Sequence, residues 1–435
     1  MKVYFDTLGC PKNFNDTQVA KGVLERDGFV ITESPDEADI IVVNTCGFIN
    51  DAKMESIEHI FEMTKFDAKL VVSGCLSQRY VNELMAEIPE VSGFFGVNDY
   101  DKFGEFLKDL QHNKVMVNQC DEKVLPLLTR KYDENPYSAT IKIAEGCNNH
   151  CAYCVIPSIR GHFRSKREED IITEAEKLAN LGCKELILIA QDVTLYGIDL
   201  YKEYRLPKLL KRLCKINGIE WIRLMYCYED RITDELIEVM RDEDKICKYI
   251  DIPIQHCSDD VLKSMNRRST KKSINNTIQR LKDAIPDIHI RTTLIVGFPG
   301  ESEENFDELL EFVENTRFAR LGTFAYSLEE NTPAGEMDNQ IDEETKQERV
   351  DAIMRRQLEI SLENNKAMIG KRLRVLVDSV DDENDNSYLA RTEYDAPEID
   401  NSVVFTSLRK LKPGDFVNVE IVDAFDYDLI GKEID

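Results

Sequence analysis

Three cysteines lie close together in the stretch EGCNNHCAYC, namely Cys147, Cys151 and Cys154. Such closely spaced cysteines are typical ligands of zinc or of an iron–sulfur cluster. A zinc site usually takes four protein ligands, and the flanking His150 and His162 could complete one. A 4Fe-4S cluster is ordinarily held by four cysteines, so three would leave one iron open for chemistry. Incidental packing is a third possibility, and the odd number of cysteines favours the cluster.

Three further cysteines each follow a short β-rich run near the start of the chain. Cys10 follows KVYF, Cys46 follows DIIVV and Cys75 follows KLVVS, with helical apolar spacing between the runs. This βαβαβ order predicts an open parallel α/β sheet, in which ligands collect at the carboxyl ends of the strands. One cysteine in such a place is usually a small buried residue, but three in equivalent places favour a shared ligand set.

Six more β-like runs alternate with helical patterns: ATIKIA, ELILIA, WIRLMY, YIDIPI, IHIRTTLIV and RLGTFAYS. Six βα units predict a partial (β/α)6 barrel with its active site at the carboxyl ends of the strands, and the Cys147 loop follows the first strand. Beyond a charged helical pattern at 342–368, short alternating strands predict a small antiparallel β-barrel. We therefore expect a multi-domain α/β protein with domains at 1–130, 137–366 and 369–435.

The composition of this chain of 435 residues, 42% hydrophobic and 31% charged, is that of a globular protein. No apolar run approaches the ~20 residues that span a bilayer, and the start MKVYFDTLGC lacks a secretory pattern. We expect a cytoplasmic protein whose 12 cysteines are thiolates or metal ligands rather than disulfides. The formal net charge of −27 disfavours non-specific binding of nucleic acid unless basic residues gather on one surface.

The spacing CxxxCxxC, with Tyr153 directly before the third cysteine, resembles the signature of the radical S-adenosylmethionine (SAM) enzymes. The resemblance places Tyr153 beside the cofactor. It implies that SAM binds the open iron and is cleaved reductively to a radical that abstracts hydrogen. With the N-terminal cysteines and the C-terminal barrel, the whole chain resembles the methylthiotransferase family. The segments that resemble its ribosomal-protein-modifying branch are TLGCPKN, CVIPSIRGHFRS, IAQDVTLYG, PIQHCSDDVLKSMNR, RTTLIVGFPGE and EYDAPEID.

For that branch, the resemblance implies methylthiolation of the β-carbon of an aspartate in small-subunit ribosomal protein twelve, free or on the ribosome. It also implies a second 4Fe-4S cluster at Cys10, Cys46 and Cys75, and two molecules of SAM. A reductant such as flavodoxin or ferredoxin would supply electrons. The alternative is the sibling branch, which methylthiolates an adenosine of tRNA. A third, non-catalytic possibility is that the clusters are redox sensors or electron carriers.

Five residues near the ends of the predicted barrel strands are candidates for SAM contacts. Gln191 and Asp192 occupy the place where many radical SAM enzymes carry a Gly-Gly-Glu motif, which this chain lacks. Arg291 could pair with the SAM carboxylate, Gln255 could hydrogen-bond its polar groups, and Gly297 would permit close approach of the adenosine. Each could instead cap a loop at a strand end. Arg160, just beyond the cysteine loop, could bind an acidic group or face solvent.

The segment 369–435 resembles a TRAM domain, which binds nucleic acid in tRNA-modifying relatives. It carries 8 Lys and Arg against 16 Asp and Glu, so RNA contact through this surface is electrostatically opposed. A basic ribosomal protein would be attracted instead, with the main effect on the rate of encounter. The alternative is that the excess negative charge only keeps the domain soluble.

Overall fold

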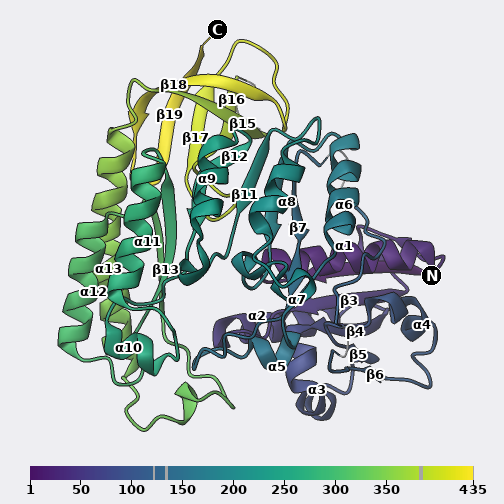
Figure 1. Cartoon of the computed structure of the whole chain (residues 1–435). Helices are drawn as coiled ribbons and strands as arrows, with labels where there is room; N and C mark the ends of the chain where they lie inside the picture. The colour runs from purple at the N-terminus through teal and green to yellow at the C-terminus, as the bar shows by residue number, and fades with distance from the viewer. Residues whose placement is uncertain (121–122, 133–135, 382–385, 435) are drawn as a thin grey trace.

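The computed structural model describes residues 1–120, 123–132, 136–381 and 386–434. Asp435, the last residue of the predicted third domain, lies outside them. The described residues form two six-stranded sheets, a closed barrel and a short two-stranded ribbon. Figure 1 shows the central sheet and its helices between the N-terminal sheet and the C-terminal barrel, with the long helix α13 (Glu343–Lys366) along one side. This arrangement confirms the predicted fold class.

The first sheet is entirely parallel, in the order β2-β1-β3-β4-β5-β6. Its strand β3 (Ile40–Thr45) is buried along its whole length because apolar side chains cover both faces. The three predicted strands are confirmed, whereas β2, β5 and β6 are too short to show a periodic pattern in the sequence. The other elements are β1 (Lys2–Thr7), β2 (Val30–Ile31), β4 (Lys69–Gly74), β5 (Gly93–Phe95), β6 (Val115–Met116), α1 (Pro11–Arg26), α2 (Asn50–Met63), α3 (Cys75–Glu87) and α4 (Phe103–Lys108).

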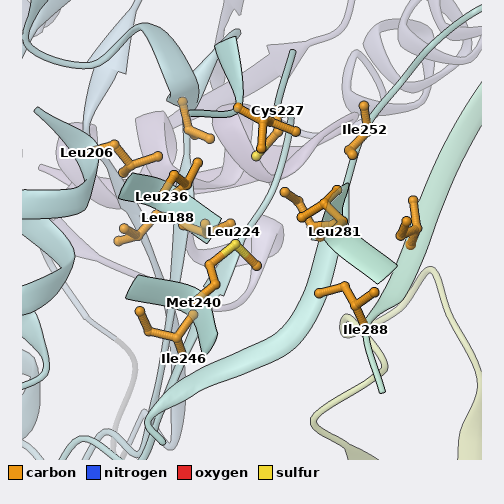
Figure 2. Close-up of a cluster of buried hydrophobic side chains, with 14 of the residues drawn as sticks. Leu188, Leu206, Leu224, Cys227, Leu236, Met240, Ile246, Ile252, Leu281 and Ile288 are labelled. Carbon is orange, nitrogen blue, oxygen red and sulfur yellow. The ribbon is translucent and has the colours of Figure 1, made fainter. Parts of the chain in front are cut away.

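The second sheet is the predicted open barrel, six parallel strands whose edges are β7 and β14. Its outward side chains form one core with the surrounding helices, and Figure 2 shows Leu188 and Leu224 of the sheet among Leu206 and Leu236 of two helices. The elements are β7 (Ser138–Lys142), β10 (Glu185–Ile189), β11 (Trp221–Leu224), β12 (Ile246–Asp251), β13 (His289–Val296), β14 (Arg320–Ala325), α6 (Glu168–Asn180), α7 (Ile198–Tyr201), α8 (Leu206–Leu213), α9 (Asp234–Asp242), α10 (Asp259–Ser264), α11 (Lys271–Ala284) and α12 (Glu303–Thr316).

Local sequence fixes where the barrel helices begin. Capping boxes start α11, at Thr270 with Ser273, and α12, at Ser302 with Asn305, because each pair satisfies backbone N–H groups that the first turn leaves free. Asp342 caps α13 by accepting a hydrogen bond from the N–H of Thr345. In the described part of the chain, no helix is both long and apolar enough to cross a membrane.

The C-terminal barrel closes in the order β15-β16-β17-β19-β18. Four of its five strand pairs are antiparallel as predicted, but β17 and β19 run parallel. The reason is geometric, since an odd number of strands cannot alternate in direction all the way around a closed ring. The strands are β15 (Arg372–Val380), β16 (Ser387–Thr392), β17 (Ser402–Thr406), β18 (Phe416–Ala424) and β19 (Asp428–Ile434).

Buried ion pairs attach the C-terminal barrel to the amino end of the central sheet. Glu185, the first residue of β10, accepts hydrogen bonds from Arg223 of β11 and Arg391 of β16, at 2.9 Å each, and has no solvent exposure. Arg320, the first residue of β14, pairs with Asp395 at 2.5 Å. Buried ion pairs are stable only when well-placed hydrogen bonds offset the cost of desolvation. Because these bonds require a particular geometry, they fix the position of the C-terminal barrel.

We predict that Arg391→Met lowers the free energy of unfolding by about 3 kcal/mol, because the change leaves buried carboxylate charge short of a partner. Arg241→Met is the matched control, since Arg241 pairs with Asp242 on an exposed surface and should cost less than about 1 kcal/mol. Urea unfolding followed by circular dichroism compares the two variants. Equal effects of the two substitutions would contradict the docking role of Arg391.

Candidate active site

The cysteine triplet lies in a tight loop at the carboxyl end of the first barrel strand, between β8 (Ala144–Glu145) and α5 (Ile156–Arg160). Gly146 has a φ of +79°, and a Cβ there would lie 2.1 Å from the carbonyl oxygen of His162, so this position requires glycine. Within the loop, the N–H of Cys154 donates to the carbonyl of Cys151 at 3.0 Å. Burial raises the pKa of the Cys147 thiol.

The N-terminal trio, Cys10, Cys46 and Cys75, converges at the carboxyl ends of β1, β3 and β4. Each cysteine adjoins a glycine, and a Cβ on that glycine would collide with another loop of the trio. A Cβ on Gly9 would lie 2.8 Å from the Cβ of Cys46, and one on Gly74 would lie 2.5 Å from the carbonyl oxygen of Thr45. Burial, and the charges of the other two thiols, raise the pKa of Cys46 to about 11.

The spacing of the side chains tests which metal group they fit. In the described ranges, no three His, Cys, Asp or Glu side chains are close enough together to ligate a single ion. Zinc bound by His150 or His162 with the triplet would need that geometry, because all its ligands meet at one atom. A 4Fe-4S cluster bonds each cysteine to a different iron, so its ligands stand further apart. The three free cysteines of each set are the kind of donor that such a cluster takes.

A polar network surrounds Cys147. The side-chain amide of Asn149 donates to the Cys147 sulfur at 3.3 Å and lies 3.4 Å from a carboxylate oxygen of Asp192. Arg231, in the turn after β11, pairs with Asp192 and donates to Asn149 at 2.7 Å. The sequence analysis missed Asn149 and Arg231. Their signal was available, because polar residues that follow a barrel strand point to the site.

Tyr153 lies beside the triplet, among aromatic and cationic side chains. Its hydroxyl accepts a hydrogen bond from Arg267 at 3.4 Å, and burial raises its pKa well above the usual value. Arg267 also stacks over the ring of Tyr228, with 4.8 Å from its guanidinium carbon to the ring centroid. The Tyr228 hydroxyl is 3.6 Å from the Cys151 sulfur. Two tyrosine rings therefore lie beside the triplet, and Arg267 contacts both of them.

A buried charge cluster joins the two cysteine sets. Arg160 of α5 donates to the Cys75 sulfur at 3.2 Å, to Asp16 at 2.5 Å and to Glu145 at 3.3 Å. Lys142 of β7 pairs with both carboxylates. Burial alone would raise the pKa of Glu145, but Lys142 and Arg160 outweigh it and hold that pKa well below its usual range. We call these four residues, Asp16, Lys142, Glu145 and Arg160, the charge bridge.

A second contact fixes the N-terminal sheet to the far edge of the open barrel. Glu329, just after β14, is 2% exposed and accepts from Lys53 of α2 at 3.0 Å and from Arg79 of α3 at 2.6 Å. The charge bridge acts at the β7 edge and Glu329 at the β14 edge. The N-terminal sheet thus spans the carboxyl end of the barrel, where both cysteine sets lie.

Two of the predicted SAM contacts lie near the carboxyl end of the barrel. Gln191 donates to Glu145 at 2.5 Å, which brings it beside the charge bridge, and its side-chain oxygen is buried without a partner. Gln255 has a φ of +71° and joins β13 through backbone hydrogen bonds with Thr293 and Ile295. Neither contact with SAM is tested by this geometry, and both stay predictions.

The structure places Arg291 away from the predicted SAM site. Arg291 is the third residue of the eight-residue strand β13, and its guanidinium pairs with Asp251 and with Asp400 of the C-terminal barrel, each at 3.2 Å. Burial opposes its charge, but the two carboxylates outweigh burial and raise its pKa further. Arg291 therefore belongs to the docking of the C-terminal barrel and not to the cysteine loop.

Gly297 has a packing role that the sequence did not indicate, and its contact with the adenosine stays a prediction. Its φ is +70°, and a Cβ would lie 2.2 Å from the side chain of Lys346, so the packing of α13 requires the glycine. In the same turn, Glu301 accepts from the N–H of Phe298 at 3.1 Å and lies 3.3 Å from Arg349. Burial raises the pKa of Glu301 to about 7 despite that arginine.

Three sequence models match the chain: the radical SAM superfamily at residues 141–313, the uncharacterized protein family UPF0004 at 2–96, and the TRAM domain at 369–434. The radical SAM match runs from the end of β7 into α12, so it covers most of the open barrel and the cysteine triplet. The fold and this loop therefore define a radical SAM enzyme.

Comparison with curated relatives identifies the family within the radical SAM enzymes. The chain is 48% identical to the ribosomal protein uS12 methylthiotransferase RimO of Desulforamulus reducens, with 98% of each chain covered. It is 47% identical to the protein of the same name from Clostridioides difficile, with 99% of this chain and 98% of that one covered. The chain belongs to the RimO family of methylthiotransferases.

Solved structures with a similar fold are more distant. The radical SAM methyltransferase TsrM of Kitasatospora setae, with cobalamin and a [4Fe-4S] cluster bound, has a TM-score of 0.60 at 15% identity, covering 77% of each chain. The cobalamin-dependent radical SAM enzyme OxsB has a TM-score of 0.52 at 12% identity, covering 81% of this chain and 56% of that one. At these identities the likeness concerns the fold alone.

We predict that Glu301→Gln flattens the pH dependence of stability. The pKa of Glu301 rises from 4.5 to about 7 on folding, so the folded state binds the proton more tightly. Its contribution is fully present below 4.5 and is lost as the pH rises through about 7, by at most about 3 kcal/mol. Thermal unfolding across this range should show a steeper decline for the native chain. Parallel curves for the two proteins would refute the assignment.

Proposed function

We propose that this protein adds a methylthio group to the β-carbon of an aspartate in ribosomal protein uS12. The observation that carries the proposal is the pairing of two cysteine trios across the charge bridge, at the carboxyl end of a radical SAM barrel. A reaction that joins a substrate radical to a sulfur atom requires the radical-forming site and the sulfur to reach the same substrate carbon. The near-full-length identity to RimO proteins supports uS12 as the substrate.

We assign the cysteines as ligands of two 4Fe-4S clusters. When bound, the cluster at Cys147, Cys151 and Cys154 and its SAM would supply a hydrogen-abstracting radical, and the cluster at Cys10, Cys46 and Cys75 would hold the sulfur that another SAM methylates. Four of the six cysteines are buried and the other two are partly buried, which limits the access of water to reactive species. The charge bridge holds the two loops in register.

The Asp192–Arg231 pair is suited to the amino-acid end of SAM. SAM carries an ammonium and a carboxylate on one carbon, and this pair offers a carboxylate and a guanidinium side by side next to Cys147, through Asn149. We therefore assign Asp192 and Arg231 to the orientation of SAM, in place of Arg291. Tyr153 and Gln191 complete the surroundings of the Cys147 loop.

The charge of the C-terminal barrel supports a protein substrate over RNA. Three of its arginines are already paired with carboxylates: Arg374 with Glu220, Arg391 with Asp378 and Glu185, and Arg409 with Glu433. Fewer cations are then left for phosphates than the sequence count suggests. We propose that the partner is a basic ribosomal protein and that the electron donor is of the flavodoxin or ferredoxin kind. We also propose that the protein works in the cytoplasm.

Mass spectrometry of uS12 tests the proposal. uS12 from cells that lack this protein should be lighter by one methylthio group in place of hydrogen, and the tRNA nucleosides of the same cells should be unchanged. Loss of a methylthio-adenosine from tRNA, with uS12 at its full mass, would establish the tRNA-modifying alternative instead.

We predict that substitutions in the two trios abolish different products. Cys147→Ala should abolish 5′-deoxyadenosine formation from SAM under reducing anaerobic conditions, because it removes a ligand of the radical-forming site. Cys75→Ala should still form 5′-deoxyadenosine but give no methylthiolated uS12. Cys214→Ala, outside both trios, is the control and should retain both products. If Cys75→Ala and Cys147→Ala lose the same product, the division of labour is wrong.

We also predict that Arg160→Met lowers the midpoint potential of the N-terminal cluster. The hydrogen bond and positive charge of Arg160 at the Cys75 sulfur favour the reduced, more negative state. Redox titration followed by electron paramagnetic resonance, in a Cys147→Ala background, isolates this cluster. Arg160→Lys should keep part of the effect. An unchanged potential at full iron content would remove Arg160 from this role.

A further inference from the structure

Lys12 lies at the border between the N-terminal sheet and the mouth of the barrel. It is the second residue of α1, two positions after Cys10, so it is tied to the N-terminal trio. Its ammonium nitrogen stands 3.4 Å from the centroid of the Tyr226 ring. A lysine of the sulfur-supplying domain thereby reaches a side chain of the radical-forming domain.

The segment around Tyr226 places this ammonium between the two trios. Tyr226 follows β11 by two residues, and its backbone is fixed by hydrogen bonds with Asp251 and Val193. Its φ of +60° is an unfavourable conformation for a tyrosine, of the kind that persists at functional sites. Two residues further on, the Tyr228 hydroxyl reaches the Cys151 sulfur. One short segment therefore touches Lys12 at one end and the triplet at the other.

Lys12 has no counter-ion among the residues that the structure describes. No carboxylate there forms an ion pair with it, and its ammonium donates no hydrogen bond. The neighbouring cations of the site, Arg160, Lys142 and Arg231, all have carboxylate partners. The ring of Tyr226 holds the ammonium in place, and the N–H groups that point away from the ring are left to donate to another group. In a chain of net charge −27, an unpaired cation at this place calls for an anionic ligand.

We propose that Lys12 binds the side-chain carboxylate of the substrate aspartate. The inference rests on the proposed function and adds a specificity residue to it. The reacting β-carbon is bonded directly to the carboxylate carbon, so anchoring the carboxylate also places the carbon that loses hydrogen. An ammonium suits this task because it is a compact charge with three rotatable donors. Asparagine, which has the same shape without the charge, would be bound less well at this position.

The test compares two substrates and four enzymes. The substrates are uS12 and uS12 with the target aspartate replaced by asparagine. The enzymes are the native chain, Lys12→Met, Lys12→Arg and the control Lys21→Met. Lys21 lies on the same helix, and its ammonium likewise faces an aromatic ring, 5.9 Å from the centroid of Phe5 in the apolar core. The measured quantities are kcat/KM for methylthiolation of each substrate, iron content, and 5′-deoxyadenosine formed without uS12.

The native enzyme and Lys21→Met should prefer aspartate over asparagine by about 10- to 100-fold, the range of one charge-assisted hydrogen bond. Lys12→Met should bring that ratio close to one through loss of the aspartate reaction, with iron content and 5′-deoxyadenosine formation unchanged. Lys12→Arg, which keeps the charge, should restore part of the ratio. These results would support the proposal.

Three results would overturn it. If Lys12→Met keeps the aspartate preference, or lowers both substrates equally, Lys12 does not bind the carboxylate. If it lowers 5′-deoxyadenosine formation without uS12, Lys12 serves SAM instead. A native enzyme that leaves both substrates unmodified would overturn the proposed function itself, and Lys12 with it, so the two failures are distinguishable.

Discussion

The charge bridge is the interaction on which the arrangement of the site depends. Two carboxylates, Asp16 and Glu145, and two cations, Lys142 and Arg160, are almost fully buried. Asp16 of the N-terminal domain pairs with both cations of the central domain, more than a hundred residues away in sequence. Such a cluster is stable only when every member is present, because one missing partner leaves a charge buried and unpaired. The two cysteine trios therefore cannot drift apart without breaking it.

Buried ion pairs also fix the elements that cover the last strand and the amino end of the barrel. Glu329 fixes the N-terminal sheet to the last strand, and Glu185 and Arg320 fix the C-terminal barrel at the amino end. An open (β/α) barrel exposes two strand edges and two ends, and here buried ion pairs, rather than an apolar interface alone, set how each is covered. The consequence for function is that two rigid elements hold the two trios at the same end of the barrel.

Part of this was visible in the sequence. Six cysteines at strand ends indicated two ligand sets, and the long β runs gave both parallel sheets, because hydrophobic periodicity and strand-end position are local signals. Arg160 was equally consistent with a solvated face, since its partner Asp16 lies 144 residues away and no local pattern records that contact. The contacts of Arg291 with Asp400 and of Gly297 with Lys346 were hidden for the same reason, because these partners come from elements that a strand-end argument does not include.

The central claim is that the two clusters face one space, and the magnetic interaction between them tests it most directly. Electron paramagnetic resonance of the reduced protein with both clusters is compared with the sum of the spectra of Cys75→Ala and Cys147→Ala. The account predicts that the spectrum of the intact protein is broadened and relaxes faster than that sum, because two paramagnetic centres held by one charge bridge interact. A spectrum equal to the sum would contradict it.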